Sequence, residues 1–437
     1  MLKGKTVAPL TLGCKVNQYE TDGMIELLKE AGMTAVSFEE KADVYLINTC
    51  SVTNMADKKS RQMIHRAKKL NPDAVVIAAG CYVQAAKDKL MEDDRISIII
   101  GNNKKKDIVQ ILEDYLEIGV TDEGMLDIAA EKEYEPLTIN STLEHTRAYV
   151  KIQDGCNQFC SYCIIPYVRG RIRSRELASI TEEVERLAQT GVKEIVLTGI
   201  HISSYGKDKE NEVGLADVID AISKIESIER IRLGSLEPGI ITDTFIDRIV
   251  DNKKVCPHFH LSLQSGCNTV LKRMNRKYTC EEYFEKCEML RKAFDRPALT
   301  TDVIVGFPGE SDEEFEITKQ FLKKIHFYEM HIFKFSPRQG TVAAGMRDQI
   351  GPEIKNQRSD VLLALSEKNK HAYEASFRGE TLEVLIEEKV RRNGKDGYRG
   401  HTERYIDIFV EEECMHRICG REVDIINHIV QIPYGME

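Results

Sequence analysis

Three of the twelve cysteines stand directly after apolar runs of strand length, and their positions constrain the fold more than any other feature of the chain. The runs are residues 7–12, 44–48 and 75–79, and the cysteines are Cys14, Cys50 and Cys81. Helix-like segments separate the runs, and this alternation predicts a doubly wound parallel sheet over residues 1–145. Ligands bind beyond the carboxyl ends of the strands in such sheets, so we expect the three thiols on one rim.

Three thiolates on one rim suit a cubane iron–sulfur cluster that leaves one iron open. Zinc is the competing metal, but a structural zinc site takes four ligands and we find no fourth. Three unrelated buried cysteines are the other alternative, because a free cysteine packs as a small hydrophobe. The repeated position at a strand exit favours Cys14, Cys50 and Cys81 as metal ligands.

A second set of cysteines lies within one short loop. Residues 148–153 have the composition of a strand and lead into Cys156, Cys160 and Cys163, which are four and three residues apart. Cysteines at this spacing can hold three corners of a 4Fe–4S cube, and the fourth iron keeps an open position. A zinc knuckle is the alternative interpretation.

Strands and helices continue to alternate through residues 146–375. With the strand at 148–153, further strands near 194–198, 230–236, 259–263, 299–305 and 330–335 give six βα units. Six units cannot close the usual eight-fold barrel, so we expect a partial (β/α)6 barrel within an α/β protein. Such barrels place their chemistry at the carboxyl ends of the strands, which is where the cysteine loop lies.

Several residues at the predicted strand exits are candidates for binding a cofactor. They are Gly199, Ser235, Glu237, Gln264, Asp302 and Pro308, together with Tyr162 in the cysteine loop. Carboxylates and amides at this rim could hold a ribose or a methionyl group, although each residue also has a structural interpretation. His258 and His260 share one face of a strand, and packing in the barrel interior is favoured over a metal site.

Basic residues follow the cysteine loop in strict alternation, namely Arg169, Arg171, Arg173 and Arg175. In an extended segment all four would project to one side, close to the cluster. This arrangement suits phosphate or a cofactor carboxylate, and a solvated surface is the alternative. We therefore expect Arg169, Arg171 and Arg173 to contact RNA.

Residues 376–437 change to short strands and turns, which predicts a small all-β barrel. Arg391, Arg392 and Arg399 lie in a basic stretch with Tyr398 and Tyr405 nearby. Basic groups interleaved with aromatic rings are typical of proteins that bind single-stranded or loop RNA. The net charge of −10 does not exclude this, because nucleic-acid binding depends on local patches.

The chain lacks the sequence signals of a membrane or secreted protein. No apolar run approaches the ~18–20 residues that a membrane-spanning helix needs. The first residues lead into no signal-peptide hydrophobic region. We expect a cytoplasmic protein with no membrane partner, and clustered cysteines in a reducing compartment indicate metal or redox chemistry.

Taken in order over nearly the whole chain, these motifs resemble the radical S-adenosylmethionine (SAM) methylthiotransferase family. The segments that carry the resemblance are TLGCKVNQYET (11–21), NTC (48–50), AGC (79–81), GCNQFCSYC (155–163) and DVIVGFPGE (302–310). The first is most similar to the branch that acts on N6-threonylcarbamoyladenosine in tRNA. The resemblance implies an amino-terminal cluster domain (1–145), a radical SAM barrel (146–375) and a TRAM-like RNA-binding barrel (376–437).

The resemblance also implies a two-stage reaction with two 4Fe–4S clusters and two molecules of SAM. One SAM methylates sulfur associated with the cluster on Cys14, Cys50 and Cys81. The second binds the open iron of the cluster on Cys156, Cys160 and Cys163, the catalytic cysteines, and yields the radical that removes hydrogen from adenine C2. The methylthio group is installed there. The implied partners are a tRNA anticodon stem-loop and a flavodoxin- or ferredoxin-like electron donor.

Other functions compete with this one. The same chemistry can act on isopentenyladenosine in tRNA or on an aspartate of a ribosomal protein. A non-catalytic iron–sulfur module for RNA binding or electron transfer is a different class, but a pure electron carrier would use a fourth ligand. A buried threonylcarbamoyl carboxylate needs a cationic partner, and we expect an arginine of the 169–175 row to supply it.

Overall fold

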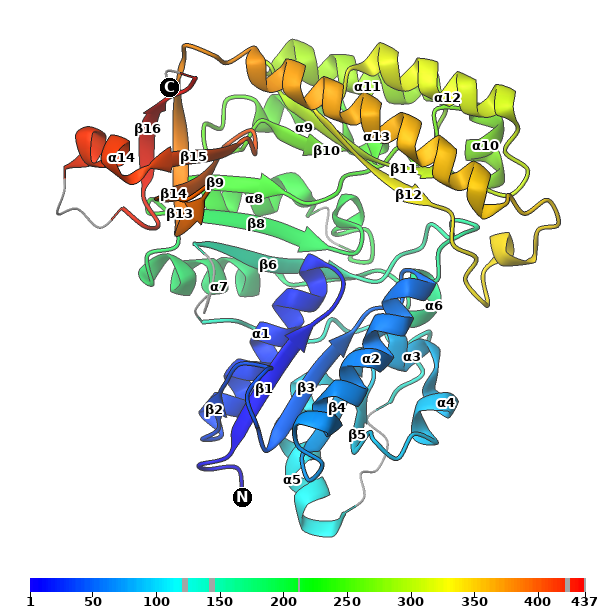
Figure 1. Cartoon of the computed structure of the whole chain (residues 1–437), viewed down its shortest axis with the longest axis vertical. Helices are drawn as coiled ribbons and strands as arrows, with labels where there is room; N and C mark the ends of the chain where they lie inside the picture. Colours follow the sequence, from blue (N-terminus) through cyan, green and yellow to red (C-terminus); the bar gives the residue numbers. More distant parts are fainter. Residues whose placement is uncertain (120–124, 141–145, 211–212, 421–424, 436–437) are drawn as a thin grey trace.

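The computed structural model describes residues 1–119, 125–140, 146–210, 213–420 and 425–435. Along the chain, a doubly wound sheet is followed by an open barrel and then by an antiparallel sheet (Figure 1). The α/β fold expected from the sequence is confirmed. The boundary expected at residue 145 lies outside the described residues. None of the described helices has the length and apolar character needed to cross a membrane.

The amino-terminal sheet is parallel throughout, with the strand order β2-β1-β3-β4-β5. Its strands are β1 (Thr6–Thr11), β2 (Thr34–Ala35), β3 (Val44–Thr49), β4 (Val75–Gly80) and β5 (Ile98–Ile100). All six residues of β3 are buried, because helices cover both faces of the sheet. The strand order reverses between β1 and β3, and the crevice beyond their carboxyl ends is where such sheets bind ligands.

Two groups of helices cover this sheet. On one face of the sheet, a hydrophobic core includes residues of α1 (Lys15–Glu30) and α5 (Ile108–Ile118). The short turn η1 (Lys105–Asp107) leads into α5. Another core joins the opposite face to α2 (Asn54–Leu70), α3 (Cys81–Ala85) and α4 (Lys87–Met91). Helix α1 also contacts the barrel, so it lies between the two parts of the molecule.

The barrel consists of six parallel strands and remains open. They are β6 (Arg147–Asp154), β8 (Glu194–Gly199), β9 (Arg230–Leu233), β10 (His258–His260), β11 (Ala298–Val305) and β12 (Glu329–Lys334). Strand β7 (Arg173–Ser174) pairs with the outer edge of β6, and a bridge between Leu236 and Leu261 joins the two halves. No pairing between β6 and β12 occurs among the described strands. The partial (β/α)6 barrel is therefore confirmed.

Helices and turns connect the barrel strands and cover their outer faces. The helices are α6 (Ile165–Val168), α7 (Leu177–Gln189), α8 (Leu215–Ser223), α9 (Asp243–Ile249), α10 (Asn268–Arg273), α11 (Cys280–Ala293) and α12 (Asp312–Ile325). The short turns are η2 (Ile202–Ser204), η3 (Pro238–Ile240) and η4 (Val342–Gly345).

Side chains alternate along each barrel strand between the helices and the barrel interior. Ala148, Val150 and Ile152 pack on α7 in the main core, so Tyr149 and Lys151 face the interior. By the same alternation, the interior positions are mostly polar: Arg147, Tyr149, Lys151, Gln153, Glu194, Thr198, Arg230, Arg232, His258, His260, Thr300, Asp302 and His331. This polar interior is suited to binding a polar ligand.

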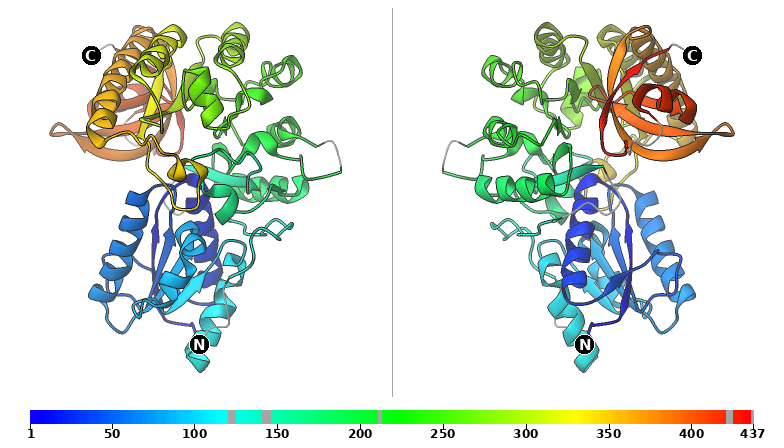
Figure 2. Two further views of the ribbon diagram at one scale, coloured as in Figure 1. Left: turned by 90° about the vertical axis from the view of Figure 1, so that its right-hand side faces the viewer. Right: turned by 90° about the vertical axis from the view of Figure 1, so that its left-hand side faces the viewer.

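The long helix α13 (Pro352–Ala375) leads from the barrel to a curled antiparallel sheet with the order β15-β14-β13-β16. Its strands are β13 (Thr381–Arg392), β14 (Lys395–Thr402), β15 (Asp407–Glu411) and β16 (Ile429–Pro433). The described strands form a half-barrel, and α14 (Glu412–Cys419), which the sequence did not predict, packs on it. Figure 2 shows this sheet beside the barrel. Arg230 and Arg232 of the barrel donate to backbone carbonyls of the sheet and hold it in place.

Candidate active site

The three strand-exit cysteines lie together at the carboxyl rim of the amino-terminal sheet. Cys14 caps α1, Cys50 follows β3 and Cys81 begins α3. Gly13 has a φ of +107°, and a Cβ at this position would lie 2.8 Å from Cys50 Sγ. Burial, together with the neighbouring Cys81 and Cys14 thiols, raises the pKa of Cys50 to about 11. The parallel topology therefore brings together three residues that are distant in the sequence.

Two polar side chains organise this amino-terminal triad (Cys14, Cys50 and Cys81). Arg169 Nε donates to Cys81 Sγ at 3.2 Å, and its Nη2 donates to Asn17 Oδ1 at 2.6 Å. Asn17 Nδ2 donates to the carbonyl oxygens of Leu12 and Thr49 and so joins the ends of β1 and β3. The sequence analysis missed Asn17, although its place one helical turn after Cys14 was a usable signal.

The arginine row does not have the geometry expected from its alternation. Helix α6 ends before Arg169 and Gly170 has a φ of +74°, so the segment is not extended. The side chains of Arg169 and Arg173 are fully buried, and Arg175 is buried against Glu183. This corrects the expectation that Arg169 and Arg173 contact RNA, because neither reaches the surface.

Each buried member of the row has an internal partner instead. Arg169 Nη2 donates to Glu20 Oε2 at 3.0 Å, and Arg173 donates to the carbonyl oxygens of Arg169 and Arg171. Arg171 is the exposed member, and its guanidinium lies 4.5 Å from the centroid of the Phe159 ring. An RNA contact at Arg171 stays a prediction.

The second group of cysteines, Cys156, Cys160 and Cys163, forms the barrel triad in the loop between β6 and α6. Gly155 has a φ of +70°, and a Cβ there would lie 1.8 Å from the Arg171 carbonyl oxygen, so the loop requires glycine. Burial raises the pKa of Cys156 to about 11 and that of Cys163 to about 12. Cys160 is half-buried as well, and a tight turn joins Cys160 to Cys163, whereas Cys156 lies earlier in the same loop.

Both triads have the donor set that a cubane iron–sulfur cluster takes. The cluster binds thiolates, yet burial raises the pKa of Cys14, Cys50, Cys156 and Cys163, so a nearby positive charge is needed. Among the described residues, each triad has one arginine on sulfur, since Arg276 Nη1 donates to Cys160 Sγ at 3.2 Å as Arg169 does to Cys81. Iron would supply the remaining positive charge.

Glu237 connects the barrel triad to the neighbouring strand exit. It accepts from Gln158 Nε2 at 2.8 Å and from His201 Nε2 at 2.5 Å, and it pairs with Arg276 at 2.9 Å. A cavity of about 620 Å³, lined by all these residues except Arg276, opens beside it. The sequence analysis missed His201 and Arg276, although His201 follows the exit of β8 by two residues.

The other expected cofactor residues lie at the same end of the barrel. A Cβ at Gly199 would lie 2.9 Å from the Gln153 carbonyl oxygen, and Ser235 is exposed at the rim. Gln264 has a φ of +72° and donates its backbone N–H to the Asp302 carbonyl at 2.8 Å. Pro308 is buried, and Tyr162 packs beside Phe307. Their roles in binding a cofactor stay predictions.

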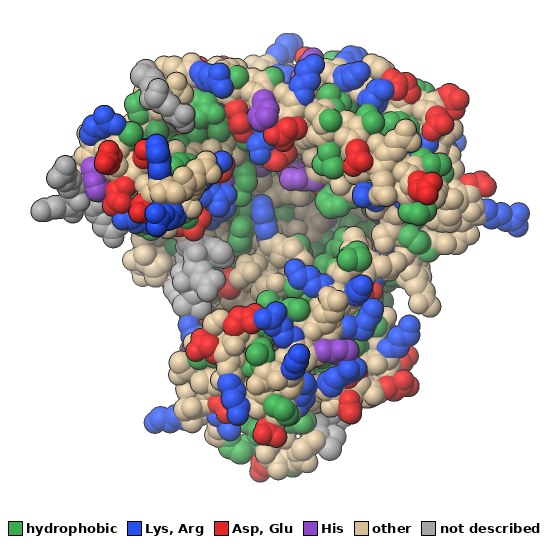
Figure 3. Space-filling view, in the orientation of Figure 1, with side chains coloured by type: hydrophobic (Ala, Val, Ile, Leu, Met, Phe, Trp, Pro, Cys, Tyr) green, Lys and Arg blue, Asp and Glu red, His purple; other side chains and the backbone are tan. Residues whose placement is uncertain are grey.

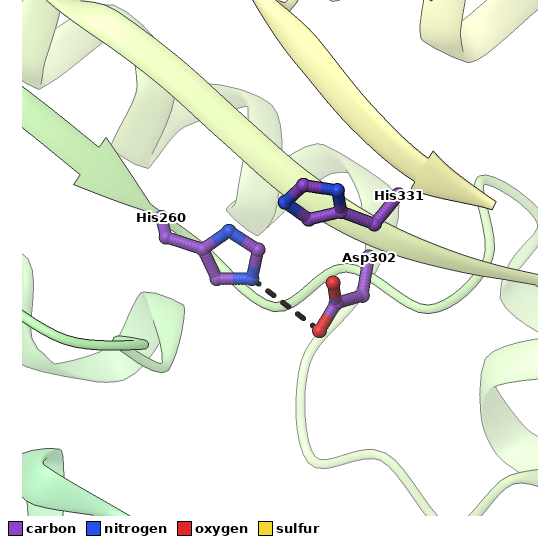
Figure 4. Close-up of side chains that lie close together, drawn as sticks. All are labelled: His260, Asp302 and His331. Carbon is purple, nitrogen blue, oxygen red and sulfur yellow. Dashed lines mark ion pairs between the residues drawn. The ribbon is translucent and has the colours of Figure 1, made fainter. Parts of the chain in front are cut away.

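Three interior side chains from adjacent strands gather near this end (Figure 4). His260 Nε2 lies 3.3 Å from Asp302 Oδ2, and the His260 and His331 rings stack with centroids 5.7 Å apart. One ligand atom from each lies within 4.8 Å of the others, and two imidazoles with a carboxylate can hold a divalent transition metal. His258 faces the same interior but stacks on Tyr405.

Lys15 reaches from the amino-terminal domain to the barrel interior. It is the first residue of α1, directly after Cys14, and its ammonium lies 5.9 Å from the centroid of the Tyr149 ring. Burial and the charges of Arg147 and Arg232 lower the pKa of Lys15 to about 8. Figure 3 shows the molecule hollowed between the two parts, with basic and histidine side chains in the hollow.

The expected RNA-binding arginines of the last domain lie on the β13–β14 hairpin. The side chains of Arg391 and Arg392 are 70% and 57% exposed. Arg399 pairs with Asp407 at 2.8 Å on the same surface. Exposed pairs of this kind contribute little to stability, so these arginines are free to exchange partners for phosphate. Their RNA contacts stay predictions.

Comparison with known proteins identifies the family. Residues 150–322 match the radical SAM superfamily, and residues 6–101 match the "Uncharacterized protein family UPF0004". The threonylcarbamoyladenosine tRNA methylthiotransferase MtaB of Bacillus subtilis (strain 168) is 42% identical over 430 residues, which cover 98% of this chain and 93% of that protein. The chain belongs to the radical SAM tRNA methylthiotransferases. It is therefore a transferase that modifies tRNA, and membership implies SAM and a 4Fe–4S cluster.

Other relatives agree with this family. MtaB of Aquifex aeolicus (strain VF5) is 41% identical, covering 92% of this chain and 96% of its own length. The tRNA-2-methylthio-N(6)-dimethylallyladenosine synthase of Thermodesulfovibrio yellowstonii is 36% identical, covering 93% of this chain and 94% of its own length. Among solved structures, the radical SAM methyltransferase TsrM from Kitasatospora setae superposes with a TM-score of 0.57 at 15% identity, covering 76% of this chain and 73% of TsrM. That likeness shows the fold alone.

Proposed function

We propose that this methylthiotransferase installs a methylthio group at C2 of N6-threonylcarbamoyladenosine, next to the anticodon of tRNA, with two 4Fe–4S clusters and two molecules of SAM. The observation that carries the proposal is that two cysteine triads lie close to each other in one chain. Ile164 and Val168, which follow the barrel triad, pack on Cys81 of the amino-terminal triad. A group formed at one triad thus has a short path to the other.

Different residues of the chain bind the two clusters and hold SAM. Cys156, Cys160 and Cys163 bind one cluster, which when bound supplies the electron that cleaves SAM. Cys14, Cys50 and Cys81 bind the other. SAM is held at the barrel rim by Tyr162, Gly199, Ser235, Glu237, Gln264, Asp302 and Pro308. The reductant is a flavodoxin- or ferredoxin-like protein.

Two observations support the threonylcarbamoyl substrate. Relatives named for threonylcarbamoyladenosine are 42% and 41% identical to this chain, against 36% for the dimethylallyladenosine synthase of T. yellowstonii. In addition, the barrel interior is polar, whereas a dimethylallyl group is best bound by apolar side chains. Carboxylate and hydroxyl groups like those of threonylcarbamoyl need polar partners when they are buried.

The test is to offer the purified, anaerobically reconstituted enzyme three tRNAs that carry threonylcarbamoyladenosine, dimethylallyladenosine or unmodified adenosine. We expect turnover on the first and little on the other two, measured by mass spectrometry of the nucleosides. Reconstitution should load about eight irons per chain, as two four-iron cubanes require. Preference for the dimethylallyl substrate, or a gain in mass on a ribosomal protein alone, would contradict the substrate assignment.

The tRNA anticodon stem-loop is held by the last domain (376–437) through Arg391, Arg392 and Arg399, with Arg171 near the active site. Replacing the three hairpin arginines with Gln should weaken tRNA binding and reduce its salt dependence by about two units of slope, since each phosphate contact contributes ~0.7–0.9. The measurement is a salt titration of affinity. Arg95→Gln, which removes an arginine paired with Asp93 on the amino-terminal domain, is the control. Unchanged affinity would place the tRNA contacts elsewhere.

A further inference from the structure

Adenine chemistry determines where the N6 group of the substrate lies. The reacting carbon, C2, has to approach the amino-terminal triad, where the transferred sulfur is held under the proposed function. C2 and C6 both flank N1 of the ring, so a group on N6 lies close to the reacting carbon. The N6 group is therefore housed in the hollow between the amino-terminal domain and the polar barrel interior (Figure 3).

Lys15 is a cation that borders this hollow. Its neighbour in the sequence is Cys14, and its side chain lies over Tyr149 on the interior face of β6. His258 lies close to Lys15 in the same space. Burial and the charges of Arg232, His260, Lys15 and His331 hold the pKa of His258 well below the usual range. Lys15 therefore lies in the same interior as His258, His260 and His331, and Figure 4 shows the group that His260 and His331 form with Asp302.

Lys15 has no ion-pair partner in the described part of the chain, and the attraction of Glu194 is weaker than the repulsion of Arg147 and Arg232. Arg147 and Arg232, which lie near it, are paired with Glu387 at 3.5 Å and Glu194 at 2.7 Å. No described carboxylate lies within ion-pair distance of Lys15. As the first residue of α1 it also lies at the positive end of the helix dipole, where a cation is unfavourable. A residue kept in an unfavourable place points to a functional partner, which here has to be an anion.

The other cations expected to meet the substrate are committed elsewhere. Arg169, Arg173 and Arg175 are buried, and Arg169 and Arg175 are paired with Glu20 and Glu183. This removes Arg169, Arg173 and Arg175 as partners for the substrate carboxylate, while Arg171, the exposed member of the row, stacks on Phe159 beside the cysteine loop. The opposite wall offers imidazoles and the Asp302 carboxylate, which pairs with His260. Lys15 remains at this hollow as a cation that has no carboxylate partner among the described residues.

We propose that Lys15 binds the carboxylate of the N6-threonylcarbamoyl group and thereby selects this substrate. The proposal rests on the proposed function and adds the residue that recognises the modification. A lysine ammonium offers three donors on a flexible stem and suits a carboxylate that arrives on a flexible substituent. An apolar N6 group would leave the ammonium without a partner, so the same residue disfavours the dimethylallyl substrate.

The test pairs changes in the enzyme with a change in the substrate. Lys15→Gln removes the charge and keeps the length, Lys15→Arg keeps the charge, and Lys29→Gln is a control at the other end of the same helix. The substrates are anticodon stem-loops with threonylcarbamoyladenosine and with its methyl ester, which lacks the carboxylate charge. We expect Lys15→Gln to raise KM about tenfold on the acid with a small change in kcat. Lys15→Arg should recover most of the loss, and Lys29→Gln should match wild type.

The methyl ester distinguishes a direct contact from an indirect effect. If Lys15 binds the carboxylate, the methyl ester should raise KM of the wild-type enzyme by about the same factor as Lys15→Gln does on the acid. The ester should leave KM of Lys15→Gln almost unchanged, so the effects of the two changes are not additive. Additive losses would overturn the proposal. An equal loss of tRNA-independent SAM cleavage would place Lys15 on the cofactor, and an altered cluster EPR spectrum with unchanged KM would place it on the cluster; either result overturns it. No turnover of wild type on threonylcarbamoyladenosine would refute the proposed function itself.

Discussion

The two cysteine triads have similar surroundings but are assembled in opposite ways. Each has an arginine nitrogen 3.2 Å from one sulfur, Arg169 at Cys81 and Arg276 at Cys160. The barrel triad comes from a single loop whose path is set by Gly155. The amino-terminal triad comes from the ends of β1, β3 and β4, and it forms only when these strands pair in their native order.

The difference separates a site that is locally encoded from one that depends on tertiary structure. Around the amino-terminal triad, Arg169 pairs with Glu20, and Glu20 in turn pairs with Lys105 and with Lys151 of the barrel. These buried charges link the triad to both parts of the molecule. We therefore expect the amino-terminal cluster site to fail under changes that leave the barrel site intact.

The largest expected effects come from removing one cysteine of each triad. Cys160→Ala should abolish both SAM cleavage and methylthio transfer, because two thiolates do not hold the cluster that starts the reaction. Cys50→Ala should keep part of the cleavage and lose the transfer. Chromatography of 5′-deoxyadenosine and mass spectrometry of nucleosides measure the two steps, and iron content should fall by about four per chain in each variant.

Cys419→Ala, on α14, is the control for loss of a cysteine as such. If Cys50→Ala made product at the normal rate, the two triads would not be separate cluster sites.

Much of this comparison was predictable from the sequence. Cysteine spacing in one loop is a local pattern, and the barrel triad was found from it directly. The amino-terminal triad was also predicted, because in a parallel sheet residues that directly follow strands meet on one rim. The extended geometry expected for the 169–175 row is wrong, since alternation places side chains on one side only in an extended segment and Gly170 turns the chain; the Arg171 contact stays a prediction.

The contacts between domains were not predictable from patterns. The partner of Arg169 is Glu20, which is 149 residues away in the sequence. Lys15 likewise looks like an ordinary lysine at the start of a helix until the barrel is packed against it. Such residues depend on how two domains meet, and no spacing within either domain specifies that.

Adding a methyl group beside each triad should show that the triad in one loop and the triad at the ends of three strands respond differently. Gly155→Ala would place a Cβ 1.8 Å from the Arg171 carbonyl oxygen, and Gly13→Ala would place one 2.8 Å from Cys50 Sγ. We expect Gly155→Ala to lose nearly all SAM cleavage. Gly13→Ala should keep most cleavage while losing transfer and part of the iron.

Gly4→Ala is the matched control, since Gly4 also has a positive φ (+82°) but a Cβ there meets nothing within 4 Å. Equal loss of cleavage in Gly13→Ala and Gly155→Ala would mean that the two sites are not independent.

Breaking the buried ion network should affect the amino-terminal site more than the barrel site. Arg169→Met removes one of the positive charges that pair with the buried Glu20 carboxylate. Removing one partner of a buried ion pair lowers the free energy of unfolding by about 3–5 kcal/mol. We expect a lower melting temperature and loss of iron from the amino-terminal triad, with tRNA-independent SAM cleavage retained. Arg171 is exposed and stacks on an aromatic ring, so Arg171→Met should lower the free energy of unfolding by about 0.5–1 kcal/mol.

Thermal unfolding and iron analysis of the two variants measure this difference. Retention of all iron in a destabilised Arg169→Met protein would mean that the triad does not need the network.

The smallest expected effect concerns the arginine on the barrel triad. Arg276→Gln removes a positive donor from Cys160 Sγ, and such hydrogen bonds and charges set cluster potentials. Reduction adds negative charge, so loss of the cation should make the potential more negative by tens of millivolts, where about 59 mV is a tenfold change for one electron. An EPR-monitored redox titration measures the shift, and SAM cleavage should slow severalfold without being abolished.

Glu237→Gln separates the charge on sulfur from the ion pair, because it keeps Arg276 and removes its carboxylate partner. With less negative charge near the cluster, the potential should move in the opposite direction. A shift of the same sign in both variants would mean that the loop has rearranged. Opposite shifts would show that the barrel site is tuned by single side chains, as expected of a locally built triad.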